Sequence, residues 1–394
     1  MATSTAPPDL EALISEEVER LAPSLLELSH RIHANPELGL EEHRASAWCR
    51  ELLAAHGFEV AAPVAGMATA FRASKGRGRP VLAFLAEYDA LPGVGHACGH
   101  NIIGASAVGA GLALSAALEK AGVAGTVFVD GTPAEETVGG KIAMVQEGLY
   151  RDVDAAVSMH PDTRSSVGGT CLAVRSLVFS FTGRAAHAAA EPERGINALD
   201  AVIQTFNNVN ALRQHCRPDV RIHGIITHGG KATNVIPDFA QAAISVRAAD
   251  LRYFEQVVEK VRNCAQAAAL ATGASLEITE EPTFEPIKEN ACLHRLSMEV
   301  LRELGEPAED LTGRLQPAST DFGNVSQVVP AVALSLRIAP PGTVCHHPDF
   351  ARAAASPQGD RCVLLAAKTM AVVGARLATR PELLEEARAD FGRG

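Results

Sequence analysis

The chain has few aromatic residues, a deficit of basic residues and no long apolar segment. Aromatic side chains make up 4% of the 394 residues and Trp48 is the sole tryptophan, so the core must be built from Ala, Val, Leu and Ile. Lys and Arg total 35 against 46 Asp and Glu, which gives a formal net charge of −11. Nucleic-acid binding needs clustered Lys and Arg, so this charge balance argues against a nucleic-acid partner.

Signals for membrane insertion and secretion are also lacking. No stretch approaches the roughly 20 apolar residues of a membrane span, and the longest candidate, 102–118, is rich in Ala and Gly. The N-terminus has no basic region followed by an apolar run, which argues against a secretory signal. The eight cysteines are scattered and do not form a disulfide framework. We therefore expect a cytoplasmic protein with no membrane partner.

The length predicts two domains. Helical patterns and short apolar runs alternate in the first part of the chain. The helices are expected at 9–34, 41–57, 102–120 and 139–149, and the strands at 81–85, 126–129 and 155–159. The runs do not alternate apolar and polar residues, which is typical of strands buried on both faces of a parallel sheet. After 287 the pattern resumes with a helix at 292–304, a strand at 331–336 and a closing helix at 357–378.

Between these two parts the pattern changes. Strand-like segments are expected at 172–182, 221–227, 239–247 and 275–280, and helices at 195–213 and 251–270. Their order is β-α-β-β-α-β, which is typical of a ferredoxin-like unit. We predict an α/β, mostly parallel-sheet domain of residues 1–172 and 287–394, and an inserted ferredoxin-like α+β domain of residues 173–286.

Metal-type ligands follow the predicted strands of the first domain. The candidate ligands are Cys98, His100, Glu136, His160 and His346. Functional groups gather beyond the carboxyl ends of parallel strands, and thiolate, imidazole and carboxylate are the ligands that zinc accepts. Five ligands exceed one tetrahedral zinc site with an open position, so they suit two metals sharing a bridge. By chemistry alone, His347 could replace His346 as a ligand.

Glu135 and Glu136 are adjacent on a loop that leaves the second strand. Neighbours on such a loop point in different directions, so one can bind metal while the other acts on water. A divalent metal lowers the pKa of a bound water to about 7, and a nearby carboxylate can take the proton and pass it to a leaving amine. Gly131 before the pair and Gly139-Gly140 after it favour a constrained loop over a solvated surface.

At this point the residues resemble a known family, the aminoacylase and carboxypeptidase type of dinuclear metallohydrolases. More narrowly, the chain is similar to the amidohydrolase subgroup that contains hippurate, indole-acetyl-amino-acid and p-aminobenzoyl-glutamate hydrolases. The markers occur in order over nearly the whole chain: Arg31-Ile32-His33, Pro36-Glu37-Leu38-Gly39, Asp89-Ala90-Leu91-Pro92, His96-Ala97-Cys98-Gly99-His100-Asn101, Pro133-Ala134-Glu135-Glu136, Met159-His160, Gly183 to His187, Asn234-Val235-Ile236-Pro237, Ser319-Thr320-Asp321-Phe322-Gly323 and His346-His347-Pro348. Asn101, where many members have Asp, is similar to the p-aminobenzoyl-glutamate hydrolases and β-alanyl dipeptidases.

The resemblance implies a role for each marker residue. It implies the five metal ligands given above, with His346 favoured over His347, and two divalent ions per subunit. Zinc is expected because Cys98 is a soft ligand, with manganese, cobalt and nickel as alternatives. Glu135 is implied as general base, and Asp89 as the carboxylate that orients a metal-binding histidine. His187 is implied to reach the partner's site in a dimer and polarise the scissile carbonyl, and Asn234 to contact substrate.

The expected function is hydrolysis of the amide bond of an N-acyl amino acid, such as an aminobenzoyl-glutamate. The alternative is a dipeptidase acting on β-alanyl or other small dipeptides, and a remote alternative is a non-catalytic binding member. Arg184 and Arg247 are weaker candidates for binding a substrate carboxylate. A nucleotide-binding protein is disfavoured, because Gly76-Arg77-Gly78 precedes the first predicted strand and no phosphate loop follows it. The inserted domain is expected to be a lid that forms a homodimer, with a tetramer as the alternative.

Overall fold

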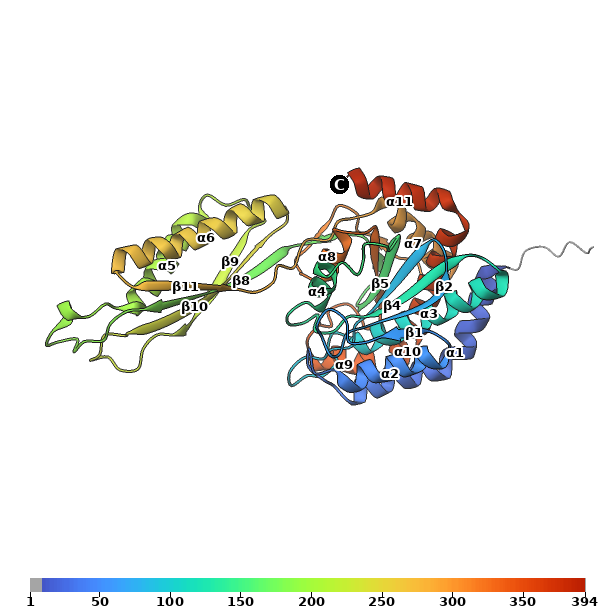
Figure 1. Cartoon of the computed structure of the whole chain (residues 1–394), viewed down its shortest axis with the longest axis horizontal. Helices are drawn as coiled ribbons and strands as arrows, with labels where there is room; N and C mark the ends of the chain where they lie inside the picture. The colour runs from blue at the N-terminus through green and yellow to red at the C-terminus, as the bar shows by residue number, and fades with distance from the viewer. Residues whose placement is uncertain (1–8, 394) are drawn as a thin grey trace, which may run out of the picture. The chain divides into compact units, whose positions relative to one another are not determined.

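The computed structural model describes residues 9–393 and divides the chain into two compact units. Unit 1 contains the chain up to Thr170, Ile287–Arg314 and the chain from Thr320 on. Unit 2 contains Cys171–Pro286 and Leu315–Ser319. The helices and strands of each unit are labelled in Figure 1.

Unit 1 is built on an eight-stranded mixed sheet with the order β1-β2-β4-β3-β5-β14-β6-β12. The four central strands β4, β3, β5 and β14 run parallel, β2 and β6 pair antiparallel to them, and β1 and β12 lie at the edges. The strands are β1 (Glu59–Ala61), β2 (Phe71–Arg77), β3 (Val81–Ala86), β4 (Gly125–Gly131), β5 (Ala155–Asp162), β6 (Ser166–Val167), β12 (Glu309–Asp310) and β14 (Ala331–Arg337). The sheet is therefore parallel in its middle and mixed at its margins.

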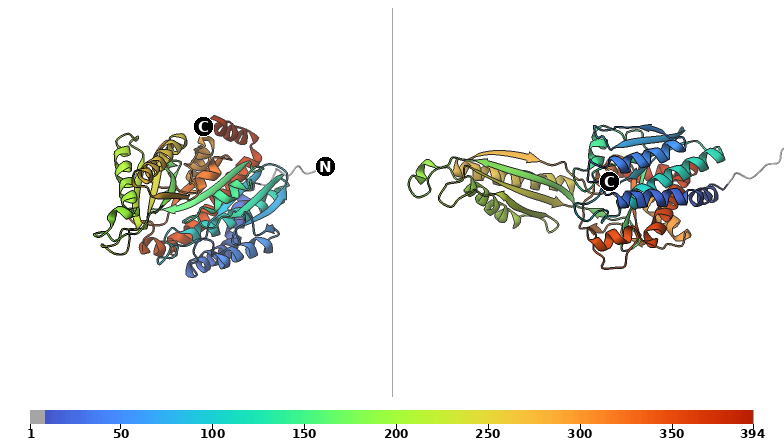
Figure 2. Two further views of the ribbon diagram at one scale, coloured as in Figure 1. Left: turned by 60° about the vertical axis from the view of Figure 1, so that its left-hand side comes forward. Right: turned by 90° about the horizontal axis from the view of Figure 1, so that it is seen from below.

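Both faces of this sheet are covered. Leu82 and Phe84 of β3 point into the larger core, whereas Ala83 and Leu85 point into a second core on the opposite face. Helices α1, α3 and α10 pack together on the first face (Figures 1 and 2). The second core contains Met144 and residues of α8. Burial on both faces explains why the strand segments are apolar without alternation.

Six helices of unit 1 lie within a few residues of the predicted positions, whereas α8, α9 and α11 were not predicted. The helices of unit 1 are α1 (Leu10–Ala34), α2 (His43–Ala55), α3 (His100–Ala121), α4 (Gly140–Gln146), α7 (Ala291–Glu303), α8 (Phe322–Ser326), α9 (Pro348–Ala354), α10 (Pro357–Thr379) and α11 (Pro381–Arg393). The prediction that the helix at 357–378 closes the chain is wrong. Pro381 ends the α10 pattern and starts α11, because proline fits the first turn of a new helix but not a helix interior.

Two helices, α3 and α10, are long and apolar enough to cross a membrane, which corrects the expectation that no segment approaches that length. Their most hydrophobic windows are 94% and 72% buried inside the fold, respectively. Buried core helices of a large α/β domain pass the same length and composition test. The hydrophobicity of α3 and α10 is therefore explained by their place against the sheet.

Unit 2 has the element order β-α-β-β-α-β predicted from the sequence. Its elements are β8 (Ala173–Thr182), η1 (Pro192–Arg194), α5 (Ala198–Arg213), β9 (Arg221–His228), β10 (Phe239–Ala248), α6 (Leu251–Thr272) and β11 (Ser275–Glu280). The four strands form an antiparallel sheet in the order β11-β8-β10-β9, and α5 and α6 lie together on one face of it (Figure 1). A small sheet of β7 (Thr170–Cys171) and β13 (Leu315–Gln316) is separate.

Candidate metal centre

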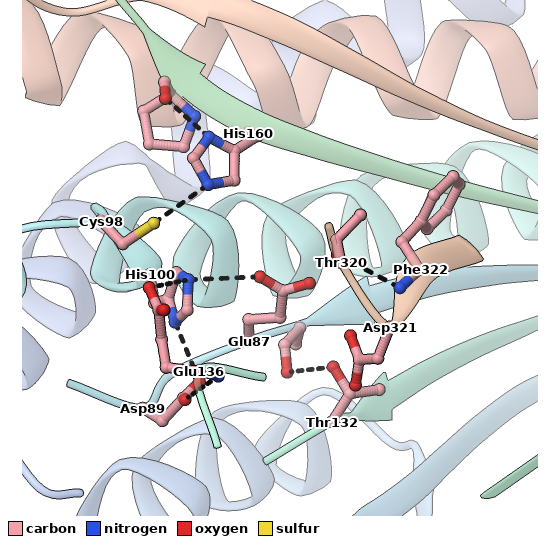
Figure 3. A network of polar contacts seen from close by, with 12 residues as sticks. Glu87, Asp89, Cys98, His100, Thr132, Glu136, His160, Thr320, Asp321 and Phe322 are labelled. Atoms are coloured by element: carbon pink, nitrogen blue, oxygen red, sulfur yellow. Dashed lines mark hydrogen bonds and ion pairs between the residues drawn. The ribbon is translucent and has the colours of Figure 1, made fainter. Parts of the chain in front are cut away.

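The candidate ligands of unit 1 meet at the carboxyl ends of the parallel strands. Glu87 and Asp89 follow β3, the Glu135-Glu136 pair follows β4, and His160 lies near the end of β5. His346 lies in the loop after β14. Since these four strands are parallel neighbours, their ends share one edge of the sheet, and Figure 3 shows several of these side chains pointing toward one another.

His100 is the first residue of α3 and is fully buried. It follows Gly99, which has a φ of 78° and whose added Cβ would lie 2.5 Å from Pro161 Cγ, so this turn requires glycine. The His100 Nδ1–H donates to Asp89 Oδ1 at 2.9 Å, and Asp89 Oδ2 accepts the Glu136 backbone N–H at 3.0 Å. Asp89 therefore fixes the His100 ring so that Nε2 points into the cluster.

The field at His100 Nε2 favours a cation. Glu87 Oε2 lies 3.5 Å and Glu136 Oε1 3.9 Å from this nitrogen. Burial opposes a charge on the ring, but the charges of Asp89, Glu87 and Glu136 outweigh burial and raise the pKa of His100 well above its usual value. Within the described residues this Nε2 is buried without a hydrogen-bond partner. A proton or a metal ion would satisfy it.

Cys98 and His160 form the next pair of donors. His160 Nε2 lies 3.2 Å from Cys98 Sγ, and its Nδ1 lies 2.7 Å from the Pro161 carbonyl oxygen. A carbonyl oxygen only accepts, so Nδ1 carries the proton and Nε2 presents its lone pair. Burial, and then the neighbouring His100, lower the pKa of His160 and favour the neutral ring. Cys98 lies with His160 and His100 in Figure 3, and their three donor atoms lie within 4.8 Å of one another.

His346, and not His347, joins the cluster. His346 Nε2 lies 3.1 Å from Glu136 Oε1, and its backbone N–H donates to the Ala97 carbonyl at 3.0 Å. His347 instead caps α9, because its Nδ1 accepts the Asp349 N–H at 3.3 Å. Geometry therefore favours His346 over His347 as the candidate ligand, a choice that the residue types alone left open.

Glu135 lies beside the donors on a restrained loop. Ala134 has a φ of 60°, and its N–H donates to Glu42 Oε1 at 2.8 Å. Burial, and then the negative charges of Glu87 and Asp321, raise the pKa of Glu135 well above its usual value. A carboxyl group with a raised pKa beside a cation site has the proton affinity that a general acid–base catalyst needs near neutral pH.

A buried ion network behind the site was missed from the sequence. Lys141 Nζ lies 2.7 Å from Glu87 Oε1 and 2.6 Å from Asp321 Oδ1, and its side chain is fully buried. Burial acts to raise the pKa of Glu87, but Lys141 and His100 outweigh it and lower that pKa. Glu87 lies two residues before Asp89 in the sequence, and this spacing could have indicated that Glu87 also lies near the site. Nothing local marks Lys141, because most lysines are exposed.

The remaining predicted residues lie in unit 2. His187 is exposed, and its Nδ1 accepts the N–H groups of Ala189 and Ala190 at 3.3 and 3.2 Å, which leaves the ring proton on Nε2. Asn234 is exposed next to it, since the Asn234 carbonyl accepts the Ala188 N–H at 3.0 Å. Arg247 Nη1 donates to Ser319 Oγ at 2.8 Å, and Arg184 Nε donates to the Arg194 carbonyl.

The donor set fits divalent metal ions. Three overlapping groups each place their donor atoms within 4.8 Å: Cys98, His100 and His160; His100, Glu135 and Glu136; and Cys98, Cys345 and His346. Imidazole, carboxylate and thiolate donors around an unpartnered buried nitrogen are the chemistry of a divalent metal centre. Cys345 was not singled out from the sequence.

Comparisons with known proteins identify the family to which the chain belongs. The profile of Peptidase family M20/M25/M40 matches residues 83–368. A mouse Xaa-Arg dipeptidase is 36% identical over 97% of this chain and 92% of its own length. One of the two p-aminobenzoyl-glutamate hydrolase polypeptides of Escherichia coli K12 is 32% identical over 81% of this chain and 71% of its own length.

A solved structure has the same fold. It is a Bacillus subtilis protein described as a dinuclear metal binding peptidase from the M20 family, with a TM-score of 0.66 and 22% identity, covering 90% of this chain and 99% of that one. The family profile spans well over half of the chain, and the match to the dipeptidase extends over nearly all of it. The chain therefore belongs to Peptidase family M20/M25/M40 and is a metal-dependent hydrolase of amide bonds.

Proposed function

We propose that the chain hydrolyses the amide bond of an N-acyl amino acid with two divalent ions held by Cys98, His100, Glu136, His160 and His346. The observation that supports the ligand assignment most strongly is the convergence of imidazole nitrogens, a thiol and carboxylates at one edge of the sheet. The imidazole lone pairs of His100 and His160 are turned inward by Asp89 Oδ1 and the Pro161 carbonyl. We infer zinc as the ion, because Cys98 is a soft sulfur ligand.

Glu135 is the proposed general base. Divalent ions, when bound, supply Lewis acidity toward water and toward the scissile carbonyl. Glu135 accepts the proton of the attacking water and then delivers it to the leaving amine nitrogen, which needs a carboxylate that is ionised but readily protonated. The raised pKa of Glu135, caused by burial and by Glu87 and Asp321, supports this double role. Asp89 holds the His100 ring and the Glu136 backbone in register with each other.

We further propose that unit 2 is a lid through which the chain forms a homodimer. The Nδ1 of His187 accepts backbone N–H groups, so its Nε2–H is a donor suited to a carbonyl oxygen. In a dimer, the partner subunit's His187 would donate to the substrate carbonyl. Asn234 lies on the segment beside His187 and is the proposed substrate contact.

A second candidate is a dipeptidase for substrates with a basic C-terminal residue. The similarity to a mouse Xaa-Arg dipeptidase extends over 97% of this chain at 36% identity, which is more than the match to the aminobenzoyl-glutamate hydrolase polypeptide. Both reactions cleave one amide bond with the same centre. They differ only in the groups that flank that bond.

One experiment tests the reaction and separates the substrates. Hydrolysis of p-aminobenzoyl-glutamate, an N-acetyl-amino acid, β-alanyl-lysine and alanyl-arginine is followed by chromatography, together with metal content by elemental analysis. We expect about two ions per chain and loss of cleavage on chelation. Glu135→Gln should keep the ions and abolish cleavage, whereas Glu147→Gln, at an exposed position, should cleave normally. Normal cleavage by Glu135→Gln, or failure to bind zinc or manganese, contradicts the proposal, and the preferred substrate decides between the two candidates.

A further inference from the structure

A second cysteine, Cys345, lies next to Cys98 at the proposed metal centre. Cys345 Sγ lies 3.6 Å from Cys98 Sγ and 3.6 Å from the Ala97 carbonyl oxygen. Its donor atom falls within 4.8 Å of those of Cys98 and His346. Both thiols are free, Cys98 is buried and Cys345 is exposed at the surface of the site. Two thiols therefore approach the same point from two segments far apart in the sequence.

Backbone contacts hold Cys345 in this place. The N–H of His346 donates to the Ala97 carbonyl at 3.0 Å, which ties the loop after β14 to the turn before α3. His346 has a φ of 65°. In extended backbone, adjacent side chains point to opposite sides. The left-handed turn at His346 breaks that alternation, so the Cys345 thiol contacts Cys98 while the His346 ring contacts Glu136.

The distance between the two sulfurs fits one tetrahedral ion. Zinc–sulfur bonds are about 2.3 Å long, so two thiolates on a tetrahedral zinc ion lie roughly 3.8 Å apart. The observed separation of 3.6 Å is within a few tenths of an ångström of this value. The donor atoms of Cys98, Cys345 and His346 all lie within 4.8 Å of one another, compared with a sulfur–nitrogen edge of roughly 3.5 Å on a tetrahedral zinc ion. Modest shifts of these side chains would bring the three donors onto one ion.

We propose that Cys345 is a further metal ligand, so that the ion held by Cys98 and His346 has two thiolate ligands. This inference rests on the metal centre proposed above. Each thiol gives up its proton to water when its sulfur binds the ion. A second thiolate adds one negative charge and a second soft donor, which favours zinc or cadmium over manganese at this position.

The test counts sulfur–metal bonds with cadmium. The full-length, metal-free protein is titrated with Cd²⁺ in the presence of a phosphine reductant, and the ultraviolet sulfur-to-cadmium charge-transfer absorption is measured. We expect Cys345→Ser and Cys98→Ser each to show about half of the wild-type intensity at saturation, and Cys345→Ser to bind Cd²⁺ at least roughly tenfold more weakly. Cys216→Ser, in unit 2, is the matched control and should equal the wild type. Cys345→Ala serves as a second variant without a hydroxyl group.

The outcomes separate this inference from the proposed function. Full wild-type intensity in both Cys345 variants, with loss of the whole band in Cys98→Ser, would overturn the role of Cys345 and leave the metal centre intact. A wild-type protein that shows no band and takes up no cadmium or zinc would overturn both. A parallel titration with Zn²⁺ and Mn²⁺ gives a readout without sulfur absorption. There, Cys345→Ser should lower the preference for zinc over manganese.

Discussion

Replacement of Lys141 by Met tests how the charged groups behind the metal centre are held. The Lys141 ammonium contacts Glu87 and Asp321 at 2.7 and 2.6 Å, and all three side chains are buried. Met has a similar length and no charge. The substitution therefore removes the cation and leaves two carboxylates buried beside each other.

The expected destabilisation is large. Breaking a buried ion pair by removing one partner costs about 3–5 kcal/mol, because the remaining charge stays desolvated without compensation. Lys141 forms ion pairs with two carboxylates, so we expect a loss of unfolding free energy in the upper part of this range. Lys141 also acts to lower the pKa of Glu135. In Lys141→Met the pKa of Glu135 should therefore rise, and the acidic limb of the pH–rate profile should move to higher pH.

The single tryptophan makes the measurement specific to unit 1. Trp48 lies in α2, under the guanidinium of Arg31 at 4.4 Å, so its fluorescence follows the unfolding of unit 1 in urea. The control is Lys120→Met, since the Lys120 side chain is 53% exposed and its contact with Glu17 is 3.8 Å long; its effect should stay below about 1 kcal/mol. The double variant Lys141→Met/Asp321→Asn should recover part of the lost free energy of unfolding, because it removes one of the two buried carboxylates left without a cation. A Lys141→Met protein as stable as Lys120→Met would refute this account.

Four further substitutions test residues around the site. Burial raises the pKa of Glu42 from 4.5 to about 7, so the folded chain keeps a proton that the unfolded chain has released, and the free energy of unfolding should fall by about 3 kcal/mol as the pH rises through this window. Urea unfolding across this pH range should show a flatter dependence in Glu42→Gln, and an unchanged slope would contradict the assignment. His346→Ala should lose bound metal and activity. His347→Ala should keep both and lose only the cap of α9, which lowers the free energy of unfolding by about 1 kcal/mol. Elemental analysis and urea unfolding distinguish the two variants, and the reverse pattern would exchange the roles of the two histidines. Gly99→Ala places a Cβ 2.5 Å from Pro161 Cγ at a φ of 78°, so it should lower the free energy of unfolding by at least about 1–3 kcal/mol. It should also weaken zinc binding, which calorimetry would detect. An unchanged stability and zinc affinity would show that the turn is not held as described.

Long, strongly patterned elements were predictable from the sequence, and short ones were not. The strand predicted at 275–280 coincides with β11, and the helix predicted at 251–270 ends two residues before the end of α6. Their patterns are local, because Leu276 and Ile278 of β11 and the apolar face of α6 pack into the same core. By contrast, β12 has two residues, Glu309 and Asp310, and exists only because it pairs in register with Ser166 and Val167 of β6. No local sequence pattern predicts such a strand.

The candidate ligands and the orienting carboxylate Asp89 could be predicted from the sequence, whereas most of the long-range contacts around them could not. Asn101 illustrates the difference. The sequence suggested a marker of substrate subgroup, but its Nδ2 donates to Ser29 Oγ at 2.9 Å and to the Ala354 carbonyl at 3.1 Å, and the side chain is fully buried. The Asn101 amide thus ties α3 to α1 and α9, and an Asp at this position could not donate these bonds. These partners are 72 and 253 residues away in the sequence.

Two left-handed residues explain how adjacent side chains acquire different roles at the metal centre. Ala134 and His346 both have positive φ, at 60° and 65°, and for residues other than glycine this conformation costs about 1–3 kcal/mol each. Each is held by a contact from a distant segment: Glu42 accepts the Ala134 N–H, and the Ala97 carbonyl accepts the His346 N–H. These contacts offset the strain and turn the chain, so that Glu136 reaches the donor cluster beside Glu135 and Cys345 reaches Cys98 beside His346. Which contacts each of these adjacent side chains makes at the site therefore depends on backbone conformation as much as on residue type.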